Sequence, residues 1–140
     1  MSNIERYRAQ HAEILRLATD LKRHLSPATL AADAAPVRRI LSELSSKLLT
    51  HLAAEDNVIY PRMLKSADAK TRALARRFVA DMHPISDAFS RYAVRWGNAA
   101  AIQANAEAFV RETQRIIQVL MERISREHVE LYSLADRLSA

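Results

Sequence analysis

The chain has 140 residues, with one glycine, four prolines and no cysteine, and its 21 basic and 16 acidic side chains give a net charge of +5. A chain of this length can bury a substantial core, so we expect residues 1–140 to form a single domain. The lack of cysteine excludes disulfides, zinc fingers, thiolate catalysis and iron–sulfur clusters.

Composition predicts an all-helical protein. Hydrophobic residues make up 49% of the chain, glycine is almost absent, and the long runs are rich in Ala, Leu, Arg and Glu. No apolar run is long enough for a membrane span and the first residues lack the apolar core of a signal peptide, so we expect a cytoplasmic protein without a membrane partner. Basic residues are spread along every predicted helix with acidic ones interleaved, which argues against a nucleic-acid partner.

The first half of the chain predicts two helices. The first covers residues 3–25 and carries His11 within its apolar stripe, while His24 lies in the last turn and is read as structural because a basic side chain there favours the helix dipole. The second helix covers residues 33–66, with Asp33 as N-cap, Pro36 in the first turn and a bend expected at Pro61.

The second helix contains the most informative pair of the sequence. His51 and Glu55 are four residues apart, so their side chains lie one above the other on the apolar face. An imidazole and a carboxylate are costly to bury without a partner. A shared metal ion would offset this cost, and a hydrogen bond at the solvent edge is the alternative.

The second half of the chain predicts two further helices. The third covers residues 68–96, carries His83 beside Met82 and is expected to kink at Pro84. Gly97 ends it, and we expect residues 98–106 to be a connection. The fourth helix covers residues 105–138 and places Glu127 and His128 on or beside its apolar stripe.

Four such helices with mostly short links predict an antiparallel up-and-down four-helix bundle. Counting residues from the predicted helix ends puts His11, His51 and His83 at nearly one height, and Glu127 agrees when counted from the C-terminal end. Counted from its start, the fourth helix is too long, so its first turns must overhang the bundle or be loop.

An internal similarity links the second and fourth helices. Glu55 and Glu127 are each followed by an apolar residue four positions later and by a tyrosine five positions later, Tyr60 and Tyr132. Facing helices that send His and Glu inward are how bundle proteins build two-metal carboxylate sites. The mixed nitrogen and oxygen donors suit iron first, with manganese or zinc as alternatives. The two tyrosines either pack in the core or donate hydrogen bonds to the ligands.

The motif His-x-x-x-Glu-Asp-x-x-Ile-Tyr-Pro at residues 51–61, with a histidine in the first and third helices and Glu-His-x-x-Leu-Tyr at residues 127–132, resembles the hemerythrin-like, or HHE cation-binding, domain. The resemblance covers nearly the whole chain. It implies a four-helix bundle with a non-haem di-iron centre that binds or senses O2, NO or peroxide, or handles iron. Carried over by position, the ligands would be His11, His51 and His83, with bridging carboxylates from Glu55 and Glu127.

The sequence departs from this family pattern at two positions. The family usually has a histidine where this chain has Arg123, a side chain that cannot ligate a metal, and Asp87 stands where oxygen-carrying members have another histidine. His128 or Tyr132 would have to substitute as ligands, and Arg123 could instead neutralise Glu127. A reversible oxygen carrier is therefore disfavoured, and a single-metal site or a site that no longer binds metal stays open.

Two functions compete on this basis. The first is a small di-iron protein whose partner is a diatomic ligand or peroxide, acting as a monomer or homodimer. The alternative is a helical interaction or regulatory module in which a degenerate site only fixes helix register. An enzyme acting on a carbon substrate ranks third, because the sequence holds no nucleophile–base pair and no phosphate loop.

Overall fold

The computed structural model describes residues 3–127, 129–130 and 133, and within these ranges the chain is helical, with short connections and no strand. The prediction of an all-helical chain is confirmed. The elements are α1 (Asn3–Arg23), α2 (Pro27–Ala32), α3 (Ala35–Ala54), the π-helical turn η1 (Glu55–Ile59), α4 (Tyr60–Leu64), α5 (Ala69–Arg95), α6 (Ala99–Ala104) and α7 (Ala106–Glu127).

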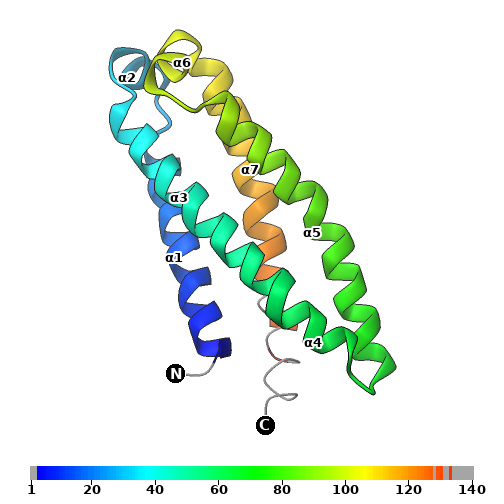
Figure 1. Ribbon diagram of the computed structural model, residues 1–140. Coiled ribbons are helices and arrows are strands. Elements are labelled where there is room, and N and C mark those ends of the chain that lie inside the picture. The colour runs from blue at the N-terminus through cyan, green and yellow to red at the C-terminus, as the bar shows by residue number, and fades with distance from the viewer. Residues whose placement is uncertain (1–2, 128, 131–132, 134–140) are drawn as a thin grey trace.

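The long helices lie side by side and run alternately in opposite directions (Figure 1). The helix α1 packs against α3 and α7, and α5 packs against the same two helices on the other side. The helices α2 and α6 lie together at the end of the molecule opposite the N-terminus (Figure 1). None of the helices in the described ranges has both the length and the apolar character that a membrane crossing requires.

The short helices α2 and α6 correct the predicted connections. Residues 26–33 were expected to link two helices, and residues 98–106 were expected to be a connection, yet Pro27–Ala32 and Ala99–Ala104 are helical. Each buries one large apolar side chain, Leu30 in α2 and Ile102 in α6. Both helices pack against α7, and they cover the first turns by which this helix was expected to overhang.

Local signals set most helix starts. Pro36 lies in the first turn of α3 as predicted, but the N-cap is Ala34, and Asp33 Oδ1 instead accepts a hydrogen bond from the Ala35 amide at 3.0 Å. At the start of α5, Asp68 Oδ1 accepts from the Lys70 amide at 3.3 Å. The helix α5 continues through Pro84 without ending.

The buried side chains form two hydrophobic clusters. The larger one fills the half of the molecule that is capped by α2 and α6, and reaches Leu52, Met82 and Ile124. The smaller one lies toward the other end and consists of Tyr7, Ile59, Tyr60, Met63, Ala75 and Phe78. Along α3 and the turn η1, His51 and Glu55 fall where the first cluster gives way to the second. Two of the buried polar side chains therefore lie at the boundary between the apolar clusters.

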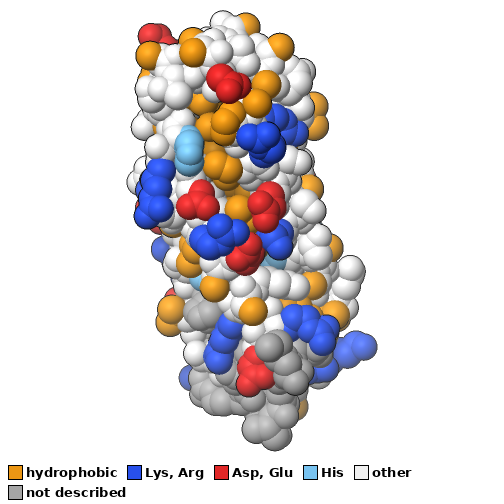
Figure 2. Space-filling model, turned by 90° about the vertical axis from the view of Figure 1, so that its left-hand side faces the viewer, with side chains coloured by type: hydrophobic (Ala, Val, Ile, Leu, Met, Phe, Trp, Pro, Cys, Tyr) orange, Lys and Arg blue, Asp and Glu red, His pale blue; other side chains and the backbone are white. Residues whose placement is uncertain are grey.

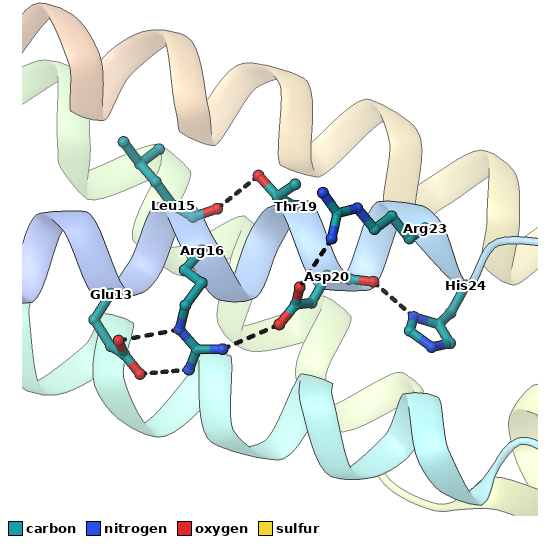
Figure 3. A network of polar contacts seen from close by, with 7 residues as sticks. All are labelled: Glu13, Leu15, Arg16, Thr19, Asp20, Arg23 and His24. Carbon is teal, nitrogen blue, oxygen red and sulfur yellow. Dashed lines mark hydrogen bonds and ion pairs between the residues drawn. The ribbon is translucent and has the colours of Figure 1, made fainter.

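The outer surface carries both signs of charge. Figure 2 shows Lys and Arg side chains interspersed with Asp and Glu on one face of the molecule. On α1, Arg16 lies between Glu13 and Asp20, with N–O distances of 2.6 and 3.1 Å (Figure 3). His24 is exposed, and its Nδ1 lies 2.7 Å from the Asp20 carbonyl oxygen (Figure 3). Such exposed contacts contribute little to stability. His24 directly follows the end of α1 at Arg23, and its predicted structural role at the helix end stays a prediction.

Candidate metal centre

The centre of the site is the pair that the sequence singled out. His51 and Glu55 are one helical turn apart, and both are buried, with exposed fractions of 1% and 0%. His51 Nε2 contacts Glu55 Oε1 directly. A carboxylate with no exposed surface is expensive unless a cation, either a proton or a metal ion, compensates its charge.

The turn η1 brings a third group to this pair. In an α-helix, a residue five positions later is rotated by about 140°, so Tyr60 would point away from Glu55. Here the Tyr60 amide donates to the Glu55 carbonyl, five residues back, which is π-helical hydrogen bonding. As a result the Tyr60 hydroxyl lies 3.2 Å from Glu55 Oε2. Pro61, where a bend was predicted, is the second residue of α4, the helix that follows this widened turn.

The helix α7 contributes the second carboxylate. Glu127 is 3% exposed, and its Oε2 lies 2.9 Å from the same Tyr60 hydroxyl. A phenol has one proton and donates to one carboxylate at a time. Burial raises the pKa of Tyr60 far above its ordinary value, and the two carboxylates add to this effect, so the hydroxyl keeps its proton.

The two glutamates also affect each other. Burial raises the pKa of Glu127 well above its ordinary value of 4.5, and the hydrogen bond and charge of Glu55 raise it further, whereas the hydrogen bond from Tyr60 lowers it. One oxygen of Glu55 lies within 4.8 Å of one oxygen of Glu127, and two buried carboxylates this close do not both ionise without a cation. The metal-free site therefore holds a proton at Glu127 that a metal ion would displace.

Gln10 on α1 fixes the orientation of the imidazole. Its Oε1 lies 3.0 Å from His51 Nδ1. Because an amide oxygen only accepts, Nδ1 carries the proton, and in the neutral ring the lone pair of Nε2 points toward Glu55. Nε2 and Glu55 Oε1 contact each other directly, so either a proton or a metal ion has to lie between them. The contact with Gln10 is the kind of second interaction that orients a metal-binding histidine.

These three side chains meet the geometric requirement for a metal site. One donor atom from each of His51, Glu55 and Glu127 can be chosen so that all lie within 4.8 Å of one another, and all three residues are buried. One imidazole and two carboxylates form a mixed nitrogen and oxygen donor set that suits iron, manganese or zinc. The residues present therefore fit a bound cation.

The other predicted ligands lie outside this group. His11 is buried on α1, with 6% of its surface exposed, but does not belong to the three-residue group. The His83 side chain is 62% exposed, and its Nε2 lies 4.0 Å from Asp56 Oδ2. His128 and Tyr132 lie outside the described residues. The roles of His11, His83 and His128 as ligands remain predictions.

Arg123 does not act on the site in the way the sequence suggested. Its Nη1 lies 3.3 Å from Asp81 Oδ2 on α5, so this guanidinium pairs with Asp81. The groups that shift the pKa of Glu127 are Glu55, Tyr60 and Asp56. Asp87, where oxygen-carrying members of the family have a histidine, is exposed.

Sequence reasoning did not anticipate Gln10 and left Tyr60 undecided between core packing and hydrogen bonding. The signal for Gln10 was its place next to His11 on the face of α1 that packs on α3, but many side chains share such a position. The signal for Tyr60 was its spacing of five from Glu55, which matches a π-helical turn and not an α-helical one. Val129 and Glu130, beyond the second glutamate, also have π-helical backbone.

The helical fold and the buried His–Glu–Glu group together are those of a helical cation-binding protein. A family model described as the hemerythrin HHE cation binding domain matches residues 2–135, and the chain belongs to that family. Comparisons with curated proteins and with solved structures gave no significant match.

Proposed function

We propose that this protein binds iron at His51, Glu55 and Glu127, inside an antiparallel four-helix bundle, and uses it to bind or sense O2, NO or peroxide. The observation that carries the proposal is the convergence of two fully buried carboxylates and one oriented imidazole within 4.8 Å. Membership in a cation-binding family supports it. Iron is the first choice because this donor set is common for redox-active iron, and manganese and zinc are the alternatives.

The residues around the donors have defined tasks in this proposal. Gln10 holds the His51 ring so that Nε2 faces the carboxylates. Tyr60 keeps its proton and lies within hydrogen-bonding distance of both carboxylates, at 3.2 and 2.9 Å, so it can donate to either one. The neighbouring apolar clusters keep bulk water away from the donors. Bound iron would supply a redox centre with coordination positions left for a small ligand.

The family resemblance implies two irons, and a second ion needs donors beyond these three. The candidates are His11, His83 and His128, which the sequence predicted as ligands. His11 is buried on α1, the helix that also supplies Gln10, and this position favours it over the exposed His83. The proposal is therefore a site of one or two irons in which His51, Glu55 and Glu127 hold the first.

Spectroscopy of iron-loaded protein tests this function. The metal-free protein is loaded with Fe(II) without oxygen, and its absorption spectrum is recorded before and after exposure to air, to NO and to dithionite. The proposal predicts an absorption change on exposure to air or NO that dithionite reverses, and predicts its loss in the His51→Ala/Glu55→Ala variant. Leu49→Ala on the same helix is the matched control, because this side chain is exposed. A spectrum that does not respond to air, NO or dithionite would contradict the proposal.

The exposure of His83 favours a second candidate. If only part of the predicted ligand set reaches the centre, the protein could be a helical interaction module whose polar centre fixes helix register. Protein purified from iron-supplemented cells separates the two functions. The module predicts metal-free protein whose unfolding temperature does not change when Fe(II) is added, whereas a metal that binds only the folded state raises that temperature.

A further inference from the structure

A second feature of the molecule is an apolar groove between α5 and α7. It has a volume of about 450 Å³, and its apolar walls are formed mainly by Ile85, Ala88, Ile116 and Val119. Tyr92, whose hydroxyl lies 2.5 Å from Thr113 Oγ1, also lines it. The volume falls within the range of small-molecule sites, and none of the three candidate metal donors lines the groove.

Two ion pairs join α5 and α7 near the ends of the groove. Arg95 pairs with Glu112, and the same carboxylate accepts a hydrogen bond of 2.6 Å from Trp96 Nε1. Beyond the other end of the groove, Arg123 pairs with Asp81 at 3.3 Å. The acidic groups at both ends are therefore already engaged by basic partners.

Two further arginines, Arg91 and Arg115, lie between these ion pairs. The contacts Tyr92–Thr113 and Arg95–Glu112 fix the antiparallel register of α5 on α7, and this register places Arg91 level with Arg115 on the opposite wall. Both side chains line the groove and are exposed, and in the described part of the chain neither has an acidic group within ion-pair distance. Two like charges therefore lie at the same height along an apolar groove, which is an arrangement that an anion stabilises.

We propose that this groove binds an organic anion that has a carboxylate head and an unbranched apolar tail. The carboxylate lies between Arg91 and Arg115, because guanidinium groups bind carboxylates in a bidentate manner. The tail runs along Ala88 and Val119 toward Ile85. Ile85 lies six positions before Arg91, which corresponds to about 9 Å of helix and suits a chain of about eight carbons. The proposal does not depend on the metal site.

Titration of octanoate into the protein, followed by the methyl resonances of Ala88, Ile116 and Val119, tests the proposal. We expect these resonances to shift with saturation, and we expect octanol to bind at least tenfold more weakly because it lacks the charge. The Arg91→Gln/Arg115→Gln variant should lose at least tenfold in octanoate affinity. The Arg39→Gln/Arg76→Gln variant removes the same charge from exposed positions outside the groove, and it should bind like the original protein.

A second variant tests the apolar part of the site. Ala88→Leu fills the groove while leaving both arginines in place, and it should also weaken octanoate binding. The proposal is overturned if octanoate leaves the methyl resonances unchanged, if octanol binds equally well, or if the arginine variant keeps full affinity. It is also overturned if sedimentation shows that a second copy of the chain covers the groove.

Discussion

At the scale of single residues, Gln10 determines which nitrogen of His51 faces the carboxylates. Replacing it with leucine removes the acceptor for Nδ1–H, so the ring can rotate or change tautomer. We expect Gln10→Leu to weaken metal binding by about 10-fold to 100-fold, as for other residues that orient metal-binding histidines. A competition titration with a chelator measures this. Gln114→Leu, an exposed position on α7, is the control, and equal affinities in all three proteins would show that Gln10 has no such role.

Glu127 gives the metal-free protein an unusual dependence on pH. Its pKa is raised in the folded state by burial and by Glu55, so the folded protein keeps a proton that the unfolded chain releases above about pH 4.5. The resulting stabilisation is fully present below that pH and is lost as the pH rises toward the folded pKa. We therefore expect the free energy of unfolding of metal-free protein to fall with rising pH relative to Glu127→Gln. Urea unfolding at several pH values measures the difference, and parallel curves would contradict this account.

At the scale of single elements, the turn η1 explains how Glu55 and Tyr60 meet. A π-helical turn holds one residue more than an α-helical turn. Removing the exposed Asn57 from it lets the helix become regular, with the glutamate and tyrosine four residues apart and still on one face. We expect this deletion to leave a cooperatively folded protein.

Deleting Ala53 from α3 is the matched comparison, because this exposed residue lies in regular α-helix. That deletion rotates everything after it by about 100° relative to the core, so we expect a much lower unfolding temperature than for the Asn57 deletion. Thermal unfolding followed by circular dichroism compares them. Equal decreases in unfolding temperature would show that η1 does not contain an inserted residue.

The short helix α2 also contributes a side chain to the hydrophobic core. Leu30 is 1% exposed, and α2 packs on α6 and α7. We expect Leu30→Ala to lower the free energy of unfolding by about 2–5 kcal/mol, as for other fully buried leucines, with no change in metal affinity. Leu49→Ala, at a side chain that is 42% exposed, should cost far less. A change in metal affinity would mean that α2 affects the centre, which lies beyond the larger hydrophobic cluster.

At the scale of the whole molecule, the sequence predicted the features that follow from the periodic spacing of residues. Spacing of apolar residues located the long helices, and the spacing of four between His51 and Glu55 identified two of the three clustered donors. Glu127 was found through its similarity to the Glu55 segment. The helix α6 was missed because an Ala-rich polar stretch carries no stripe, although Asn98 caps it and Ile102 anchors it.

Other features depend on tertiary contacts that periodicity does not reveal. Level counting put His83 beside the other histidines, but height along a helix does not specify its rotation, and the His83 side chain is mostly exposed. The contact of Gln10 with His51 joins residues 41 positions apart. The pairing of Arg123 with Asp81, likewise, could not be told from a pairing with Glu127 until α5 was placed beside α7.

The most direct test of the account is calorimetric titration of Fe(II), without oxygen, into the metal-free protein and into a Glu55→Gln/Glu127→Gln variant. Glutamine keeps the size of each side chain and one accepting oxygen while removing its charge. The account predicts at least one Fe(II) bound per chain by the original protein, with proton release, and no binding by the variant. Binding of equal strength and stoichiometry in both proteins, or in neither, would contradict the claim that these buried carboxylates hold a cation.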